Sequence, residues 1–123
     1  MTGELRDADT QRLLVPHVVA AESPVARTVG LIGRRSLDEG EALWFDRTSA
    51  IHTFFMAFPI DVLFLDAATV ATGIAAAVPP WRPFVGVRGA RSVLELAAGS
   101  CERLGIAKGM KLTLRWGPHI SSS

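Results

Sequence analysis

Apolar and polar residues alternate or cluster along this chain in ways that predict mostly β-strands. The stretch MKLTLRW (residues 110–116) predicts a final strand whose last six residues alternate, which would place three polar side chains on one face and three apolar ones on the other. Other stretches are rich in β-branched and aromatic residues and bounded by turn-forming ones, which predicts further strands. These predicted strands cover residues 12–21, 42–45, 52–58, 60–65, 70–78 and 92–97.

Two segments carry helix signals instead. In residues 23–34, Ser23 can cap the first turn and Pro24 suits the first helical position. Apolar residues then recur at the i, i+4, i+7 spacing of one helix face, at Val25, Val29 and Ile32. A second, short helix is predicted near 98–105 and would end at Gly105.

Many short strands with two helices indicate a β-dominated α+β domain. The 123 residues suffice for one domain with a sizeable core, and we assign it to residues 12–117. The polar residues 1–11 and the terminal residues 118–123 are expected to be flexible tails.

Composition narrows the classes of function. A formal net charge of +1 argues against a nucleic-acid-binding protein, which needs a large basic face. The charged start and the lack of a long uninterrupted apolar run predict a cytoplasmic protein that does not enter a membrane. The single cysteine, Cys101, rules out an internal disulfide and is expected to be a small buried apolar side chain.

One histidine and one mid-run acid stand inside the largely apolar stretch IHTFFMAFPIDVLFLD (residues 51–66) and are candidates for catalysis. His52 would share a strand face with apolar side chains, and Asp61 would lie beside leucines. Because a buried carboxylate is costly without a partner, Asp61 is expected to have one. That partner could be His52 or one of three arginines, Arg34, Arg88 and Arg91. Such pairing serves either a structural role or acid–base chemistry, and the pattern leaves both open.

The proline-rich and glycine-rich stretch PPWRPFVGVRGAR (residues 79–91) predicts a stiff loop and a candidate ligand site. Arginines bind carboxylate or phosphate groups through a planar fork of donors, and an exposed tryptophan offers a flat stacking surface. We expect a small anionic ligand to be held by Trp81, Arg82, Arg88, Arg91 and Arg34. The alternative is that Trp81 fills the end of the core while the arginines are solvated or pair with Asp61 and Glu95.

Recognisable metal, cofactor and nucleophile motifs are lacking. The three histidines are scattered, there is no cysteine pair, and neither a phosphate-binding loop nor a nucleophile elbow occurs. We therefore expect neither a metal nor a cofactor.

Four motifs in order resemble one family, the domain of unknown function 192. They are RTVGLIGR (27–34), PIDVLFLD (59–66), VLELAAG (93–99) and RLGIAKGMKL (103–112), within a match from about Val18 to Leu114. The resemblance implies an antiparallel sandwich or barrel-like body with a helix packed on it, and it implies no reaction. HTFFM (52–56) replaces the Trp-Met-Lys-Asn-Thr of many members, so no function of that motif carries over.

Three functions remain open. We favour a binding module with a site between the Trp81–Arg91 loop and the Asp61 strand. The first alternative is a structural or protein-interaction module with exposed aromatic residues such as Phe55, Trp81 or Phe84. The second is an enzyme in which His52 and Asp61 act as an acid–base pair, which requires the two side chains to lie within hydrogen-bond reach.

Overall fold

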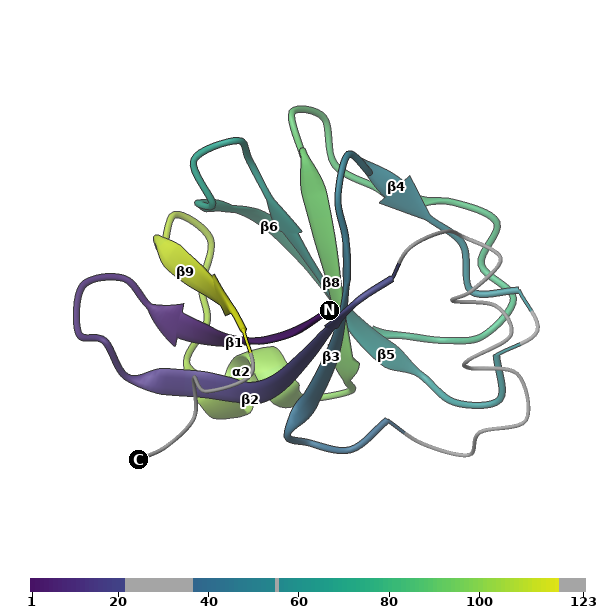
Figure 1. Ribbon diagram of the computed structural model, residues 1–123. Helices are drawn as coiled ribbons and strands as arrows, with labels where there is room; N and C mark the ends of the chain where they lie inside the picture. The colour runs from purple at the N-terminus through teal and green to yellow at the C-terminus, as the bar shows by residue number, and fades with distance from the viewer. Residues whose placement is uncertain (22–36, 55, 118–123) are drawn as a thin grey trace.

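The computed structural model describes residues 1–21, 37–54 and 56–117, and its main feature is a strongly curled seven-stranded sheet (Figure 1). The strand order across the sheet is β6-β5-β8-β3-β2-β1-β9, and a separate pair of short strands joins β4 to β7. The strands are β1 (Thr2–Asp7), β2 (Leu13–Ala20), β3 (Glu41–Phe45), β4 (Ala50–Ile51), β5 (Ile60–Leu65), β6 (Ala71–Val78), β7 (Val85–Gly86), β8 (Ser92–Ala97) and β9 (Leu112–Trp116).

The β-dominated fold expected from the pattern of apolar residues is confirmed. Five of the predicted strand ranges contain β2, β5, β6, β8 and β9, and a sixth, 42–45, covers β3 except its first residue, Glu41. The sheet is antiparallel except between β2 and β3, which run parallel, so the expectation of an antiparallel body holds for the other pairs.

Two predictions about strands were wrong. The stretch 52–58 is no strand in its described residues, and only Ala50–Ile51 before it forms β4. Residues 1–11 are not a flexible tail, because β1 lies inside the sheet between β2 and β9. The polar composition of the first residues misled the prediction: Gly3, Glu4 and Leu5 are all buried.

The described residues contain one short helix, α2 (Ser100–Leu104), where the sequence predicts the shorter of two helices. Gly105 ends it in the left-handed conformation, at φ 73°, which a glycine adopts at little cost. The longer helix predicted over 23–34 lies outside the described residues, as does the predicted tail 118–123.

The two faces of the sheet bury separate apolar clusters. The inner core fills the concave face, where α2 also packs, and its largest members are Leu5, Leu63, Leu65, Leu94, Leu96 and Leu112. The outer core lies on the other face, under β4 and β7, and includes Phe45, Ile51, Met56, Phe58, Ile60, Val62, Phe64 and Val93.

At one point the curl brings the two edges of the sheet together. An antiparallel bridge joins Val70 to Lys111, and the N–H of Leu112 donates to the carbonyl of Thr69 at 3.0 Å. The N–H of Ala71 donates to the carbonyl of Met110 at 2.9 Å. The sheet is thus a half-barrel whose edges touch at this point.

Candidate functional site

Asp61 is buried on the inner face and is held by backbone N–H groups. Only 1% of the residue is exposed. Its Oδ1 accepts hydrogen bonds from the N–H groups of Ala77 at 2.9 Å and Gly99 at 3.1 Å, and its Oδ2 accepts one from Cys101 at 2.9 Å. These donors come from β6 and from the start of α2, so the carboxylate ties three elements together.

The donors suit a carboxylate because of the local backbone conformation. Ala77 and Gly99 have φ angles of 49° and 88°, which turn the chain sharply at the points where their N–H groups meet Asp61. Gly99 is the N-cap of α2 and has no side chain to bond the free N–H groups of the first turn. Asp61, on β5, instead supplies the acceptor for the N–H of Cys101 in this first turn. The expected partners His52, Arg88 and Arg91 are therefore not required to compensate its charge.

Cys101 contacts this carboxylate, and its thiol has low reactivity. Burial, followed by the negative charge of Asp61 and a hydrogen bond to it, raises the pKa of the Cys101 thiol to about 12. A thiol with so high a pKa is almost wholly protonated near neutral pH and is a poor nucleophile. The sequence interpretation of Cys101 as a small buried apolar side chain is confirmed.

His52 belongs to a different environment. Its Nδ1 accepts a hydrogen bond from the N–H of Phe54 at 3.2 Å, and its ring centroid lies 5.1 Å from that of Phe54. Its neighbour Ile51 belongs to the outer core, whereas Asp61 shares the inner face with Leu63 and Leu65. The structure does not bring the two proposed catalytic residues together, and it gives the acid–base hypothesis no support.

Thr53, which the sequence analysis passed over, organises the loop that follows β6. Its N–H donates to the carbonyl of Arg82 and its carbonyl accepts from the N–H of Trp81, both at 2.9 Å. Its Oγ1 donates to the carbonyl of Pro79 and accepts from the N–H of Arg82, both at 2.8 Å. A threonine within a largely apolar stretch was the available signal, but its partners lie more than twenty-five residues away in the sequence.

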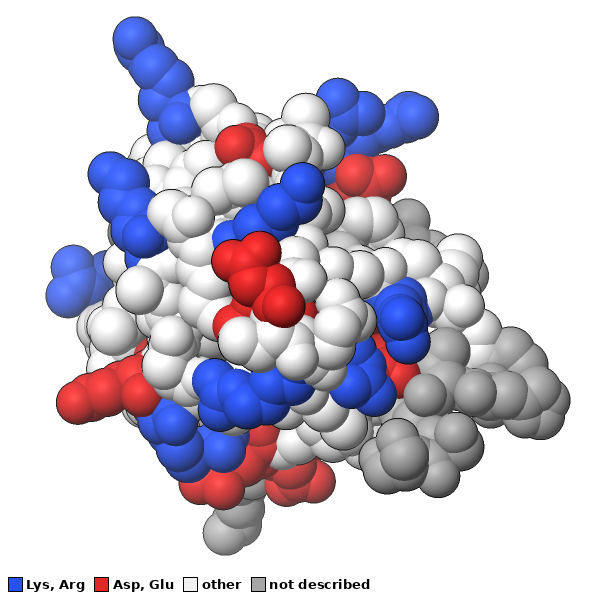
Figure 2. Space-filling model, turned by 90° about the vertical axis from the view of Figure 1, so that its left-hand side faces the viewer, with Lys and Arg blue, Asp and Glu red and all other residues white. Residues whose placement is uncertain are grey.

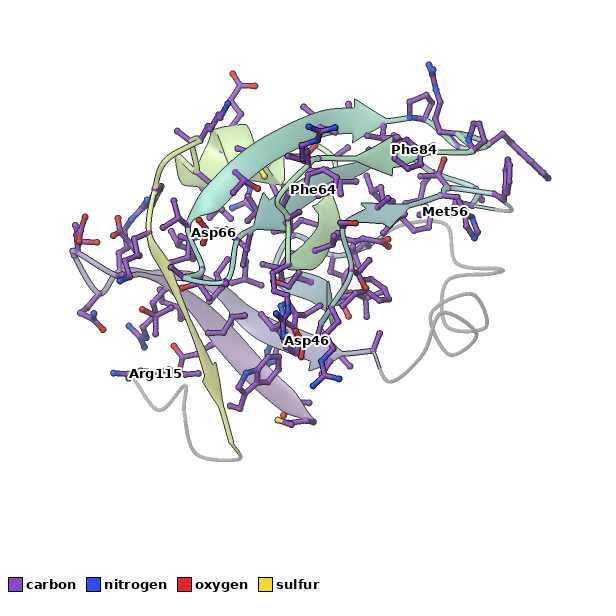
Figure 3. The ribbon with its side chains drawn as sticks, turned by 90° about the horizontal axis from the view of Figure 1, so that it is seen from above. Asp46, Met56, Phe64, Asp66, Phe84 and Arg115 are labelled. Carbon is purple, nitrogen blue, oxygen red and sulfur yellow. The ribbon has the colours of Figure 1, made fainter. Side chains whose placement is uncertain are left out.

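This loop presents two exposed aromatic side chains. Trp81 is 59% exposed and Phe84 is 72% exposed. Trp81 adopts a φ angle of 67°, a conformation that costs a non-glycine residue on the order of 1 kcal/mol. Figure 3 shows Phe84 and Met56 at one end of the molecule, far from Asp66 and Arg115 at the other. The alternative that Trp81 plugs the core is not supported, because most of its side chain faces outward.

The arginines of the predicted site are spread along this segment. Residues 81–91 run antiparallel to residues 48–53: Arg82 meets Thr53, and the carbonyl of Arg91 accepts from the N–H of Thr48 at 2.9 Å. The paired strands β4 and β7 lie between these two points. Arg82, Arg88 and Arg91 are all exposed, and the structure does not gather them around Trp81. Arg34, the remaining member, lies outside the described residues.

Neither the charged side chains nor the possible metal ligands form a further candidate site in the described residues. Figure 2 shows positive and negative side chains interspersed over one face of the molecule. Within residues 1–21, 37–54 and 56–117, no three histidine, cysteine or acidic residues cluster as metal ligands would. In the same part of the chain, no helix has the length and apolar character needed to cross a membrane.

Known proteins resemble the chain over nearly its whole length. A crystal structure of a protein described as a candidate transcription regulator from Sinorhizobium meliloti 1021 has a TM-score of 0.78 and 24% identity, covering 93% of this chain and 94% of that one. A second, of a protein of unknown function from Novosphingobium aromaticivorans DSM 12444, has a TM-score of 0.75 and 22% identity, covering 92% and 84%. At these identities the likeness is one of fold alone.

No curated protein matches the chain. The sequence model of domain of unknown function 192, described as an uncharacterised ACR, matches residues 5–114. That range includes all of the motifs that suggested the family and nearly the whole curled sheet. The chain therefore belongs to the family of domain of unknown function 192.

Proposed function

We propose that this protein is a binding module that holds a small, ring-bearing anion on its Trp81 surface. The Trp81 surface consists of His52, Phe54, Trp81 and Arg82. The rings of Phe54 and Trp81 have their centroids 6.1 Å apart, and His52 continues the row beyond Phe54. Flat aromatic faces favour a ring by stacking, and the guanidinium group of Arg82 favours a carboxylate or phosphate.

The observation that carries this proposal is the rigidity of an exposed indole. Thr53 fixes the backbone of Trp81 and Arg82 on both sides, so the indole is presented from an ordered loop. A surface that is fixed before binding loses little conformational entropy when a ligand arrives. An apolar side chain held outward at a conformational cost is better explained by contact with a ligand than by the stability of the fold.

Of the ligand-binding residues expected from the sequence, the proposed site keeps Trp81 and Arg82, and it no longer includes the Asp61 strand. Asp61 is left out because its carboxylate lies on the inner face, whereas the residues that follow Trp81 in the loop, such as Val85 and Val87, pack on the outer core. Asp61 is also already bonded by N–H groups. The enzyme hypothesis loses its acid with this residue, and a non-enzymatic binding role is the function that the geometry supports best.

Phenyl phosphate and benzoate are suitable probes, with benzyl alcohol and acetate as matched controls that lack the charge or the ring. We expect only the first two to raise the melting temperature in differential scanning fluorimetry and to give a binding isotherm by calorimetry. Trp81→Ala should weaken that binding about tenfold or more. The control Val19→Ala removes another exposed apolar side chain and should leave affinity unchanged. Equal affinity in the two variants would contradict the proposal.

A second candidate function is supported by Phe84. Its 72% exposure, three residues from Trp81, makes this end of the molecule more apolar than a solvated loop requires. A protein partner covering both side chains would make the chain an interaction module. If none of the small probes binds but Phe84→Ala and Trp81→Ala both abolish retention of one stoichiometric partner, this second function replaces the first.

A further inference from the structure

The edge of strand β9 that faces away from β1 carries backbone N–H and carbonyl groups that can pair with another strand. The N–H of Leu112 donates to the carbonyl of Thr69 at 3.0 Å, and the carbonyl of Leu112 accepts from Thr69 Oγ1 at 2.7 Å. The backbone of Leu112 thus points away from β1. Backbone groups alternate in direction along a strand, so those of Leu114 and Trp116 point the same way. Gly117 confirms the alternation, because its N–H turns to β1 and donates to Thr2.

Beyond Leu112 this outward row is unoccupied in the part of the chain that the structure describes. The N–H and carbonyl groups of Leu114 and Trp116 have no hydrogen-bond partner on the open side among those residues. The ladder between β9 and β1 runs through five consecutive residue pairs without a bulge, so this edge is regular. The other outer strand, β6, has two register shifts in its ladder with β5 and offers a less regular edge.

One face of β9 carries an apolar strip along this open edge. Leu114 and Trp116 are only partly buried where they pack against the inner core. The ring of Trp116 lies 5.1 Å from that of Trp44 and covers Gly3, where a Cβ atom would come within 2.5 Å of the indole. The strip is therefore fixed in place, and a neighbouring strand could extend the inner core over it.

The other face of β9 carries two cations. Lys111 and Arg115 are exposed, and four residues of strand separate them by about 13 Å. Neither has an ion-pair partner among the described residues. Glu4, which lies opposite Arg115 in the ladder, is buried and pairs with Arg6. Positive charges on an edge strand oppose pairing with an identical strand, because like charges would then lie close together.

We propose that the open edge of β9 binds an extended segment of another protein in which acidic and apolar residues alternate. The backbone of that segment would pair with Leu114 and Trp116. An acidic side chain of the segment would lie beside Arg115, and its apolar side chains would cover the indole of Trp116. Val70 already occupies the position beside Lys111, so Lys111 would attract the segment only from beyond its end. Main-chain hydrogen bonds give such strand addition its affinity, and the two faces give it specificity. Figure 3 shows Arg115 of this site at the opposite end of the molecule from Phe84, which lies in the same loop as Trp81.

A labelled peptide of about eight residues that alternates glutamate and valine tests the proposal by fluorescence anisotropy. We expect it to bind the wild-type protein, to bind more weakly as salt increases, and to bind Arg115→Glu about tenfold more weakly. The matched variant Arg88→Glu reverses the charge of another exposed arginine and should bind like wild type. A lysine–valine peptide of the same length should not bind.

A second peptide separates strand pairing from mere attraction of charge. N-methylation of alternate residues removes its backbone donors while its side chains stay the same, so binding should be lost in the register that faces Leu114 and Trp116. Hydrogen exchange at the amides of these two residues should slow when the unmodified peptide is bound. The proposal is overturned if the glutamate–valine peptide fails to bind at about 1 mM, if Arg115→Glu binds it equally well, or if peptides methylated in either register retain full affinity.

Discussion

Asp61 and Cys101 form a contact in which one side chain determines the chemistry of the other. The carboxylate accepts the N–H of Cys101, and together with burial its charge raises the pKa of the Cys101 thiol to about 12. The sequence alone contained a cysteine beside an acid, Glu102, and that neighbour is exposed. The acid that matters is forty residues away, so only the fold could identify it.

The raised pKa of Cys101 predicts a loss of stability in alkali. Below the ordinary pKa of 9.0, both folded and unfolded states keep the thiol proton and the contribution is fully present. Between 9.0 and about 12 the unfolded state loses the proton while the folded state keeps it, so the free energy of unfolding falls. The slope is at most about 1.4 kcal/mol per pH unit.

Urea unfolding of wild type and Cys101→Ala at several pH values between 8 and 10.5 measures this effect. We expect the alanine variant to lose less stability over that interval, since it has no thiol to ionise. Parallel pH profiles for the two proteins would show that the thiol does not titrate as its burial predicts.

Thr53 and Asp61 show what a sequence pattern could predict about the candidate sites. The requirement that Asp61 have a partner followed from its apolar neighbours and is met by three N–H groups. The expectation of a cation came from counting side chains, and backbone donors leave no such trace in a sequence. The role of Thr53 could not be predicted either, because its partners are also backbone groups, those of the loop after β6. An exposed Trp81 was one of the two alternatives that the residues of its own loop left open, and its exposure of 59% decides between them.

At the scale of elements, Asp61 is the junction of β5, β6 and α2. Asp61→Ala would leave the buried N–H of Cys101 and the part-buried N–H groups of Ala77 and Gly99 without their acceptor, and we expect it to lower the free energy of unfolding by about 3–5 kcal/mol. Asp61→Asn keeps one acceptor oxygen and should cost less, about 1–3 kcal/mol. Chemical denaturation gives both values.

Asp46→Ala is the matched control for this junction. Asp46 is exposed, and its carboxylate accepts the N–H of Arg47 at 2.9 Å, so its removal should change the free energy of unfolding by only about 0.5 kcal/mol. If Asp61→Ala were as mild as the control, the three hydrogen bonds would contribute little and the junction would have to be explained by packing alone.

The predicted strand at 52–58 shows why element boundaries were harder to predict than element types. Its apolar alternation is real, because Met56 and Phe58 join the outer core. A strand, however, needs a continuous ladder, and the backbone of Thr53 is bonded to the turn at Trp81 and Arg82. Hydrophobic periodicity reports which side chains are buried, whereas pairing depends on residues far away in the sequence.

For the whole molecule, the sheet order places distant parts of the chain side by side. The first strand, β1, pairs with the last, β9, and the loop before β6 meets the residue before β9. The strands could be predicted from local pattern, but their order could not, because it arises from contacts between these distant segments. The expectation of a flexible start failed for this reason: a short, partly charged stretch became an interior strand.

This position of β1 predicts that the first residues are indispensable to the fold. Deleting residues 1–7 would remove Leu5 from the inner core and take from β9 the strand with which it forms its ladder. We expect the shortened chain to lose its cooperative urea transition. The single substitution Leu5→Ala should keep that transition but lower the free energy of unfolding by about 2–5 kcal/mol, whereas Thr2→Ala, at the exposed end of the strand, should change little. A shortened chain that unfolds at the same urea concentration as the full one would mean that β9 is held without β1, and the edge proposed to bind a partner strand would then have to be placed elsewhere.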